Sequence, residues 1–139
     1  MYIYIDSDKN QDVFPENRNN DFRIKLPKEL RLQGKWEVAL IEVDLPKITN
    51  DYDPKYFILC TPACTENAFN DSLKPILRRV YRDQIRQNKH IHYEKPIYVP
   101  IIVDSLDIFH LYIRDDQNEP PSFQNGPSYC VLHLRQCPA

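Results

Sequence analysis

The sequence predicts a single all-β domain, a sandwich or barrel of about seven or eight short strands. Apolar and polar residues alternate in several short segments, which is the pattern of strands that bury one face. The 139 residues include twelve prolines and nine tyrosines but only two glycines. Proline interrupts helices, whereas tyrosine favours half-buried positions in sheets. A hydrophobic content of 42% is enough for one core, so we expect one domain over residues 1–139.

Three segments in the first half of the chain read as strands with simple patterns. Residues 2–6 and 22–26 alternate between apolar and polar side chains, and a polar stretch over residues 7–21 separates them as a long surface loop. Residues 56–60 form a short apolar run bounded by prolines, which also suits a strand. We expect the first two strands to have one solvated face.

Residues 36–45 are apolar on both faces and should lie inside the sheet. Such a pattern indicates either a strand that is covered on both sides or a β-bulge near Leu40 and Ile41. Trp36, at the start of this apolar segment, is expected in the core.

The segment 73–86 is ambiguous between strand and helix. Its apolar residues recur at helical spacing, and Pro75 is acceptable in a first helical turn. These apolar residues are Leu73, Ile76, Leu77, Val80 and Ile85. From periodicity alone, a helix is favoured here.

The last third of the chain resumes the strand pattern. Residues 90–102 are broken by Pro96 and Pro100, whereas 107–115 and 128–136 alternate regularly. The clearest alternating strands predict a core that is listed here: Phe22, Ile24, Leu40, Leu111, Ile113, Leu132 and Leu134.

Several stretches follow one another in a distinctive order. They are FPENRNNDFRIKLPKELRLQGKWEVALIEVDLPK, PILRRVY, PIYVPI and IFHLYIRDD, followed by SFQNGPSYCVLHLR. In this order the chain resembles the penton, or minor capsid, proteins of Polinton or Maverick elements and the related adintoviruses. That family has a Phe-Pro-x-Asn stretch and then strands of the types F-x-V-x-L-P, G-x-W-E-V-A-L, LLR, P-x-Y-x-P, I-x-I-x-D-D-x-G and L-H-F-R. The resemblance covers most of the chain.

Two positions depart from the family pattern. Gln117 and Asn118 stand where the family has a glycine, and Leu134 replaces a phenylalanine. Asparagine can adopt the left-handed turn conformation, so we expect the hairpin to be kept. Leucine keeps an apolar side chain in the last strand.

The resemblance implies a single jelly-roll β-sandwich of eight antiparallel strands in two sheets. In that fold the residues 76–81 and 91–94 are strands, which overrides the helical reading of the middle segment. It further implies a structural virion protein, not an enzyme, that forms homopentamers at the fivefold vertices of an icosahedral capsid. Its neighbours would be double-jelly-roll major capsid proteins, and assembly would take place inside the host cell, in the nucleus.

Metal, cofactor and disulfide chemistry are not expected. His90 and His92 form an H-x-H pair that aims both rings to one side of a strand, which would suit zinc. The four cysteines, however, lack ligand spacing and are expected to be reduced thiols. They are Cys60, Cys64, Cys130 and Cys137.

Catalytic motifs are also missing from the sequence. There is no G-x-S-x-G elbow and no phosphate-binding glycine loop. The pairs Asp51 with Asp53 and Asp115 with Asp116 fall short of the ligand number of a calcium loop, so we expect solvated turns. We also expect no membrane span and no signal peptide, and therefore use inside a cell.

The segment 74–89 is locally basic in a chain whose net charge is −2. Its six basic residues face a single acid, Asp83, and are listed here: Lys74, Arg78, Arg79, Arg82, Arg86 and Lys89. This pattern suits either a solvated surface or weak, non-specific contact with packaged DNA.

The alternative function is a monomeric β-sandwich module that binds a carbohydrate or peptide. A cluster of exposed tyrosine and tryptophan residues would favour it. In the capsid reading, the long segments 7–21 and 61–72 are candidates for vertex surfaces.

Overall fold

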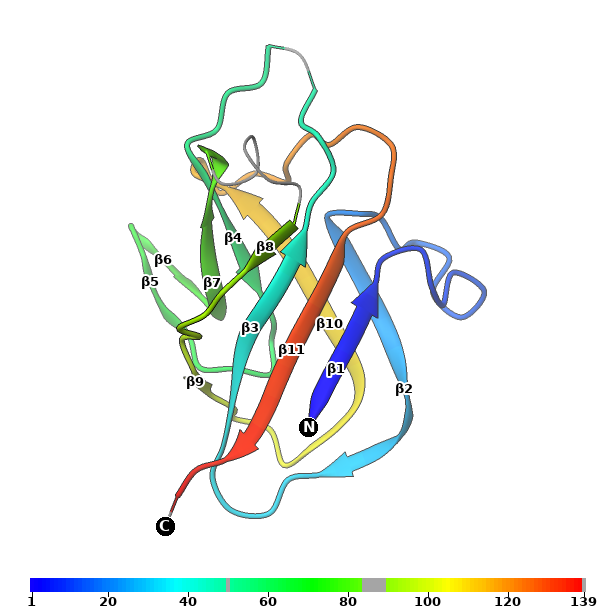
Figure 1. The fold of residues 1–139 in the computed structure, drawn as a ribbon, viewed down its shortest axis with the longest axis vertical. Coiled ribbons are helices and arrows are strands. Elements are labelled where there is room, and N and C mark those ends of the chain that lie inside the picture. The colour runs from blue at the N-terminus through cyan, green and yellow to red at the C-terminus, as the bar shows by residue number, and fades with distance from the viewer. Residues whose placement is uncertain (50, 84–89, 139) are drawn as a thin grey trace.

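A computed structural model describes residues 1–49, 51–83 and 90–138 as an antiparallel all-β sandwich (Figure 1). One sheet, here the β11 sheet, has the strand order β1-β11-β3-β8, with β9 also paired to β3. The facing β10 sheet has the order β2-β10-β4-β7. β5 and β6 form a separate two-stranded hairpin. The strands of the β11 sheet are β1 (Tyr2–Asp6), β3 (Trp36–Asp44), β8 (His90–His92), β9 (Val99–Pro100) and β11 (Tyr129–Gln136). The others are β2 (Asp21–Arg31), β4 (Tyr56–Cys60), β5 (Asn67–Phe69), β6 (Ser72–Lys74), β7 (Ile76–Tyr81) and β10 (Ser105–Asp115).

The all-β sandwich that the sequence predicted is confirmed, but the strands are more numerous. Within the described residues there are eleven strands in three sheets, whereas eight strands in two sheets were predicted. The additional strands are β5, β6 and β9, each two or three residues long. Such short strands carry no readable alternation.

The ambiguous middle segment contains a strand over the expected residues 76–81. β7 pairs with β4, and the register shifts between Leu59 and Cys60, which leaves one extra residue on β7. Because of this bulge, Leu77 and Val80 are both buried although they are three residues apart. The bulge therefore explains the helical spacing of Leu77 and Val80. The part of the segment 73–86 from residue 84 onward lies outside the described residues.

β8 differs from its expected position, because it spans His90–His92 rather than 91–94. The register of β3 against β11 shifts between Leu40 and Glu42, so that Ile41 is an extra residue. Of the two alternatives considered for residues 36–45, the bulge near Leu40 and Ile41 is thus present. Asn118 has a φ of 60°, the left-handed conformation that the sequence predicted for this turn.

The core lies between the two main sheets. Of the predicted core, Phe22, Leu40, Leu111, Ile113, Leu132 and Leu134 are buried. Ile24 is only partly buried, because β2 is the edge strand of its sheet and Ile24 lines a surface groove. Trp36 also packs against the core without being fully buried, and its indole N–H donates to the Gln33 carbonyl at 2.9 Å.

No helix in the described part of the chain has the length and apolar character needed to cross a membrane.

Candidate interaction surface

Among the described residues, the outer face of the β11 sheet has more exposed aromatic side chains than the β10 sheet has. On β1, Ile3 and Ile5 point into the core, so Tyr2 and Tyr4 point outward. Tyr129 of β11 lies on the same face, because it pairs with Asp6 two residues beyond Tyr4. Tyr2, Tyr4 and Tyr129 are 57%, 75% and 45% exposed. We call these three residues the tyrosine face.

A set of fixed contacts borders the tyrosine face at one end. The rings of Tyr2 and His133 stack with centroids 4.5 Å apart. The Tyr98 hydroxyl lies 2.7 Å from His133 Nδ1, and Arg135 lies 3.4 Å above the Tyr98 ring. Arg135 Nε donates to Glu37 Oε1 at 2.6 Å. These contacts order Tyr2 and Tyr98 without burying them.

The pKa of His133 is lowered by partial burial, by the N-terminal ammonium group and by Arg135. A lower pKa favours the neutral imidazole. In that form Nδ1 can accept the hydrogen bond from the Tyr98 hydroxyl.

The histidine pair lies on the same outer face, over β3. His90 Nδ1 is 3.0 Å from Asp44 Oδ1, and His90 Nε2 is 3.6 Å from Glu42 Oε1. His92 is also exposed and pairs with Glu42 across the strands. No three or more His, Cys, Asp or Glu side chains among the described residues are placed to hold a metal ion.

The cysteine thiols are unpaired, and three of them are buried. Burial is the main cause that raises the pKa of Cys60 to about 12, of Cys64 to about 11 and of Cys130 to about 12. A thiol with so high a pKa is not a nucleophile near neutral pH. Cys137 is half-buried in the C-terminal tail. The three buried thiols therefore act as small apolar side chains in the sandwich.

Three of the four aspartates in these pairs, Asp53, Asp115 and Asp116, have partners within the chain. Asp115 is buried and accepts hydrogen bonds from the Tyr52 hydroxyl and from the backbone N–H groups of Gln117 and Glu119. Burial and the nearby Asp115 carboxylate raise the pKa of Tyr52. Asp53 forms an ion pair with Arg82. Asp115 thus stabilises a turn, and the aspartates do not form a separate site.

The basic segment is less available to a partner than its charge suggests. Arg78 lies 3.6 Å above the ring of Tyr93, which is only 8% exposed. Arg79 is exposed and lies beside Tyr81 at the surface. Arg86 and Lys89 lie outside the described residues. The described part of the segment therefore has its arginines on different sides of β7.

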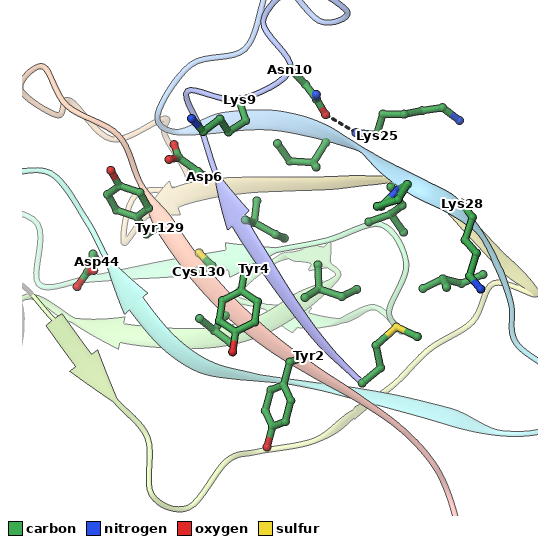
Figure 2. Close-up of a pocket in the computed structure, with 18 residues that line it drawn as sticks. Tyr2, Tyr4, Asp6, Lys9, Asn10, Lys25, Lys28, Asp44, Tyr129 and Cys130 are labelled. Carbon is green, nitrogen blue, oxygen red and sulfur yellow. Dashed lines mark hydrogen bonds between the residues drawn. The ribbon is translucent and has the colours of Figure 1, made fainter.

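A groove opens between the edge strands of the two sheets, β1 and β2 (Figure 2). Its volume is about 1030 Å³. The apolar lining includes Ile5, Ile24, Leu26 and Leu30, and the lysines around it are Lys9, Lys25 and Lys28. Lys25 forms an ion pair with Asp107 at 2.5 Å.

The tyrosine face and the groove were not predicted from the sequence. The phase of alternation in YIYID and SYCVLHLRQ already separates the outward tyrosines from the inward apolar residues. However, only the pairing of β1 with β11 brings Tyr129 near Tyr4. The groove depends on the edges of two different sheets, which no local pattern specifies.

No protein-family model matches this sequence, and no curated protein matches it significantly.

Proposed function

We propose that this chain is a structural virion protein with a jelly-roll fold, a penton or minor capsid protein that forms pentamers at the vertices of an icosahedral capsid. The observation that carries the proposal is the strand order. The order β1-β11-β3-β8 facing β2-β10-β4-β7 is what two nested Greek keys produce when eight strands form two sheets. Jelly rolls of this kind are frequent in viral capsids. The short strands β5, β6 and β9 are then insertions in an eight-stranded frame.

The proposed mechanism is geometric and needs no chemical step. A rigid sandwich with loops at both ends can close a ring through head-to-tail contacts between copies. Five copies would form such a ring, and the ring would fit among double-jelly-roll major capsid proteins.

Native mass spectrometry over a range of protein concentrations tests this proposal. We expect a species of about 83 kDa, five copies of the 16.6 kDa chain, whose population grows with concentration. A chain that remains monomeric at every concentration, and that also forms no ring in electron micrographs, would contradict the proposal.

The second candidate is a monomeric module that binds a carbohydrate or peptide, and the tyrosine face favours it. Tyr2, Tyr4 and Tyr129 present exposed rings on neighbouring strands, and such rings supply apolar area together with a polar hydroxyl. Lectin domains also use jelly rolls.

Calorimetric titration with soluble oligosaccharides separates the two candidates. If the module binds sugars, Tyr4→Ala should abolish the heat of binding, while Tyr81→Ala, an exposed tyrosine on β7, should leave it unchanged. If Tyr4→Ala instead alters only the pentamer population, the capsid proposal gains support.

A further inference from the structure

The two edge strands that border the groove are protected very differently. β2 pairs with β10 on one side, and loop side chains cover part of its other side. Asn17 accepts from the Arg23 N–H at 2.8 Å and donates to the Arg23 carbonyl at 2.8 Å. Asn10 Oδ1 accepts from the Lys25 N–H at 2.7 Å, the bond drawn in Figure 2. The amides of Asn17 and Asn10 thus replace a neighbouring strand along this edge.

Among the described residues, none covers the free side of β1 in a comparable way. Met1 and Leu134 exchange backbone hydrogen bonds of 3.0 and 2.8 Å. The Ser7 N–H donates to the Ser128 carbonyl at 3.0 Å. Antiparallel pairing alternates, so the backbone groups of Tyr2 and Tyr4 must point away from β11. Within the part of the chain that the structure describes, β1 pairs with β11 alone. Exposed edges are usually blocked by Lys, Pro or a bulge, and the segment YIYI has none of these.

The groove lies beside this free edge. Figure 2 shows β1 along one side of the groove and β2 along the opposite side. A strand that paired with Tyr2 and Tyr4 would send alternate side chains toward Ile24, Leu26 and Leu30. Its remaining side chains would lie beside the tyrosine face. The free edge and the apolar groove therefore fit one kind of ligand, an extended peptide.

The charges around the groove indicate which peptide sequences would bind best. Lys25 already has Asp107 as a partner, but Lys9 and Lys28 form no ion pair with any described residue. Figure 2 shows Lys9 beside Asp6, at the end of β1, whereas Lys28 lies far from both on the β2 side. An acidic residue in the peptide would therefore be stabilised next to Lys28.

A second copy of this chain does not fit the groove as well. If two β1 strands paired with each other, the partner strand would bring Ile3 and Ile5 side chains that are already 8% and 3% exposed in its own core. The apolar wall formed by Ile24 and Leu30 would then stay uncovered. A separate peptide has its alternate side chains available for that wall.

We propose that the groove between β1 and β2 binds an extended segment of a partner protein by β-strand addition to β1. The segment has apolar residues at alternate positions and an acidic residue that faces Lys28. Five paired residues would span about 17 Å. Backbone hydrogen bonds supply affinity in this binding mode, and the side-chain groove supplies specificity. This inference goes beyond the proposed capsid assembly and does not require a ring.

A random nonapeptide display library selected against the full chain tests the proposal. The chain should be immobilised through its C-terminus, because the N-terminal amino group bonds to Leu134. We expect enrichment of peptides with alternating apolar residues and an acid near one end. With Lys28→Glu as the bait, the enriched charge should change to Lys or Arg. Absence of enrichment, or enrichment of helically spaced apolar residues, would overturn the proposal.

Backbone pairing is tested with Tyr4→Pro, which removes an outward N–H and leaves the bonds to β11 intact. Binding of a selected peptide, measured by fluorescence anisotropy, should weaken at least about 10-fold, which corresponds to about 1.4 kcal/mol. Tyr4→Phe is the matched control and should change the affinity less than about twofold. Circular dichroism checks that both variants fold.

A peptide-side change keeps the test decisive if Tyr4→Pro does not fold. N-methylation of alternate amides in the selected peptide should abolish binding in one register and spare it in the other. Equal binding by both methylated forms would overturn strand addition. If the wild-type chain forms a dimer that competes with the peptide, the free edge of β1 binds a second copy. If no peptide is enriched and dodecanoate binds the groove, the ligand is an amphiphile. Either result would replace the proposal.

Discussion

β11 and β7 were both identified as strands, yet they present their side chains in different ways. β11 alternates regularly, so Cys130, Leu132 and Leu134 are buried while Tyr129 and Arg135 face solvent. In β7 a bulge interrupts the alternation, and Arg78 lies over the buried Tyr93. A charged residue in a strand is therefore not necessarily a surface charge. The pairing register decides which side it occupies.

Substitutions on the inward side of β11 should lower the free energy of unfolding more than the other changes considered below. Leu132 is 0% exposed, and Leu132→Ala should lower the free energy of unfolding by about 2–5 kcal/mol, because it removes buried apolar contacts and leaves a cavity. Val131→Ala, on the outward side, should cost less than about 1 kcal/mol. Urea denaturation measures both values. A loss below about 0.5 kcal/mol for Leu132→Ala would mean that the alternation is assigned to the wrong face.

Two neighbouring arginines of β7 should contribute different amounts to the free energy of unfolding. Arg78→Ala should cost about 1–2 kcal/mol of unfolding free energy, because its guanidinium lies over a ring that is shielded from water. Arg79 is exposed, and Arg79→Ala should stay within about 0.5 kcal/mol. Equal losses for the two variants in the same denaturation assay would mean that the bulge does not direct Arg78 inward.

DNA contact by the basic segment stays a prediction, and the structure changes how it should be tested. Arg78 and Arg82 already contact Tyr93 and Asp53. The double variant of Lys74→Glu with Arg79→Glu should therefore weaken binding to duplex DNA by about fivefold at low salt. The effect should be equal for any DNA sequence. Absence of DNA affinity in a low-salt filter-binding assay would leave the segment as an ordinary solvated surface.

His133, on the outward side of β11, should make a small, pH-dependent contribution to stability. Because its pKa is lowered in the folded state, the neutral form stabilises the fold fully above about pH 6.5. This contribution is lost as the pH falls through the lower pKa of the folded state. Melting temperatures from pH 7.5 to 5 should thus fall more for the wild type than for His133→Gln. Identical pH profiles would show that His133 does not contribute.

Local patterns were sufficient for the parts of the fold that depend on alternation. They located β2, β10 and β11, most of the core and the bulge at Ile41. They could not locate β5, β6 and β9, because strands of two or three residues show no period.

The candidate surfaces were harder to predict, because they depend on which strands become neighbours. Tyr4 and Tyr129 are far apart in the chain, and only the pairing of β1 with β11 places them on one face of the same sheet. The inward position of Arg78 depends on a bulge that is defined by its pairing with β4. Neither fact is encoded in a short window of sequence.

The proposed function depends on the assembly of this sandwich into a fivefold ring. Single-particle electron cryomicroscopy of the purified chain at high concentration, after mild crosslinking, tests it most directly. We expect class averages with five equal lobes, each of which accommodates the β11 sheet packed on the β10 sheet. Particles with twofold symmetry, or single lobes at every concentration, would rule out the pentameric ring.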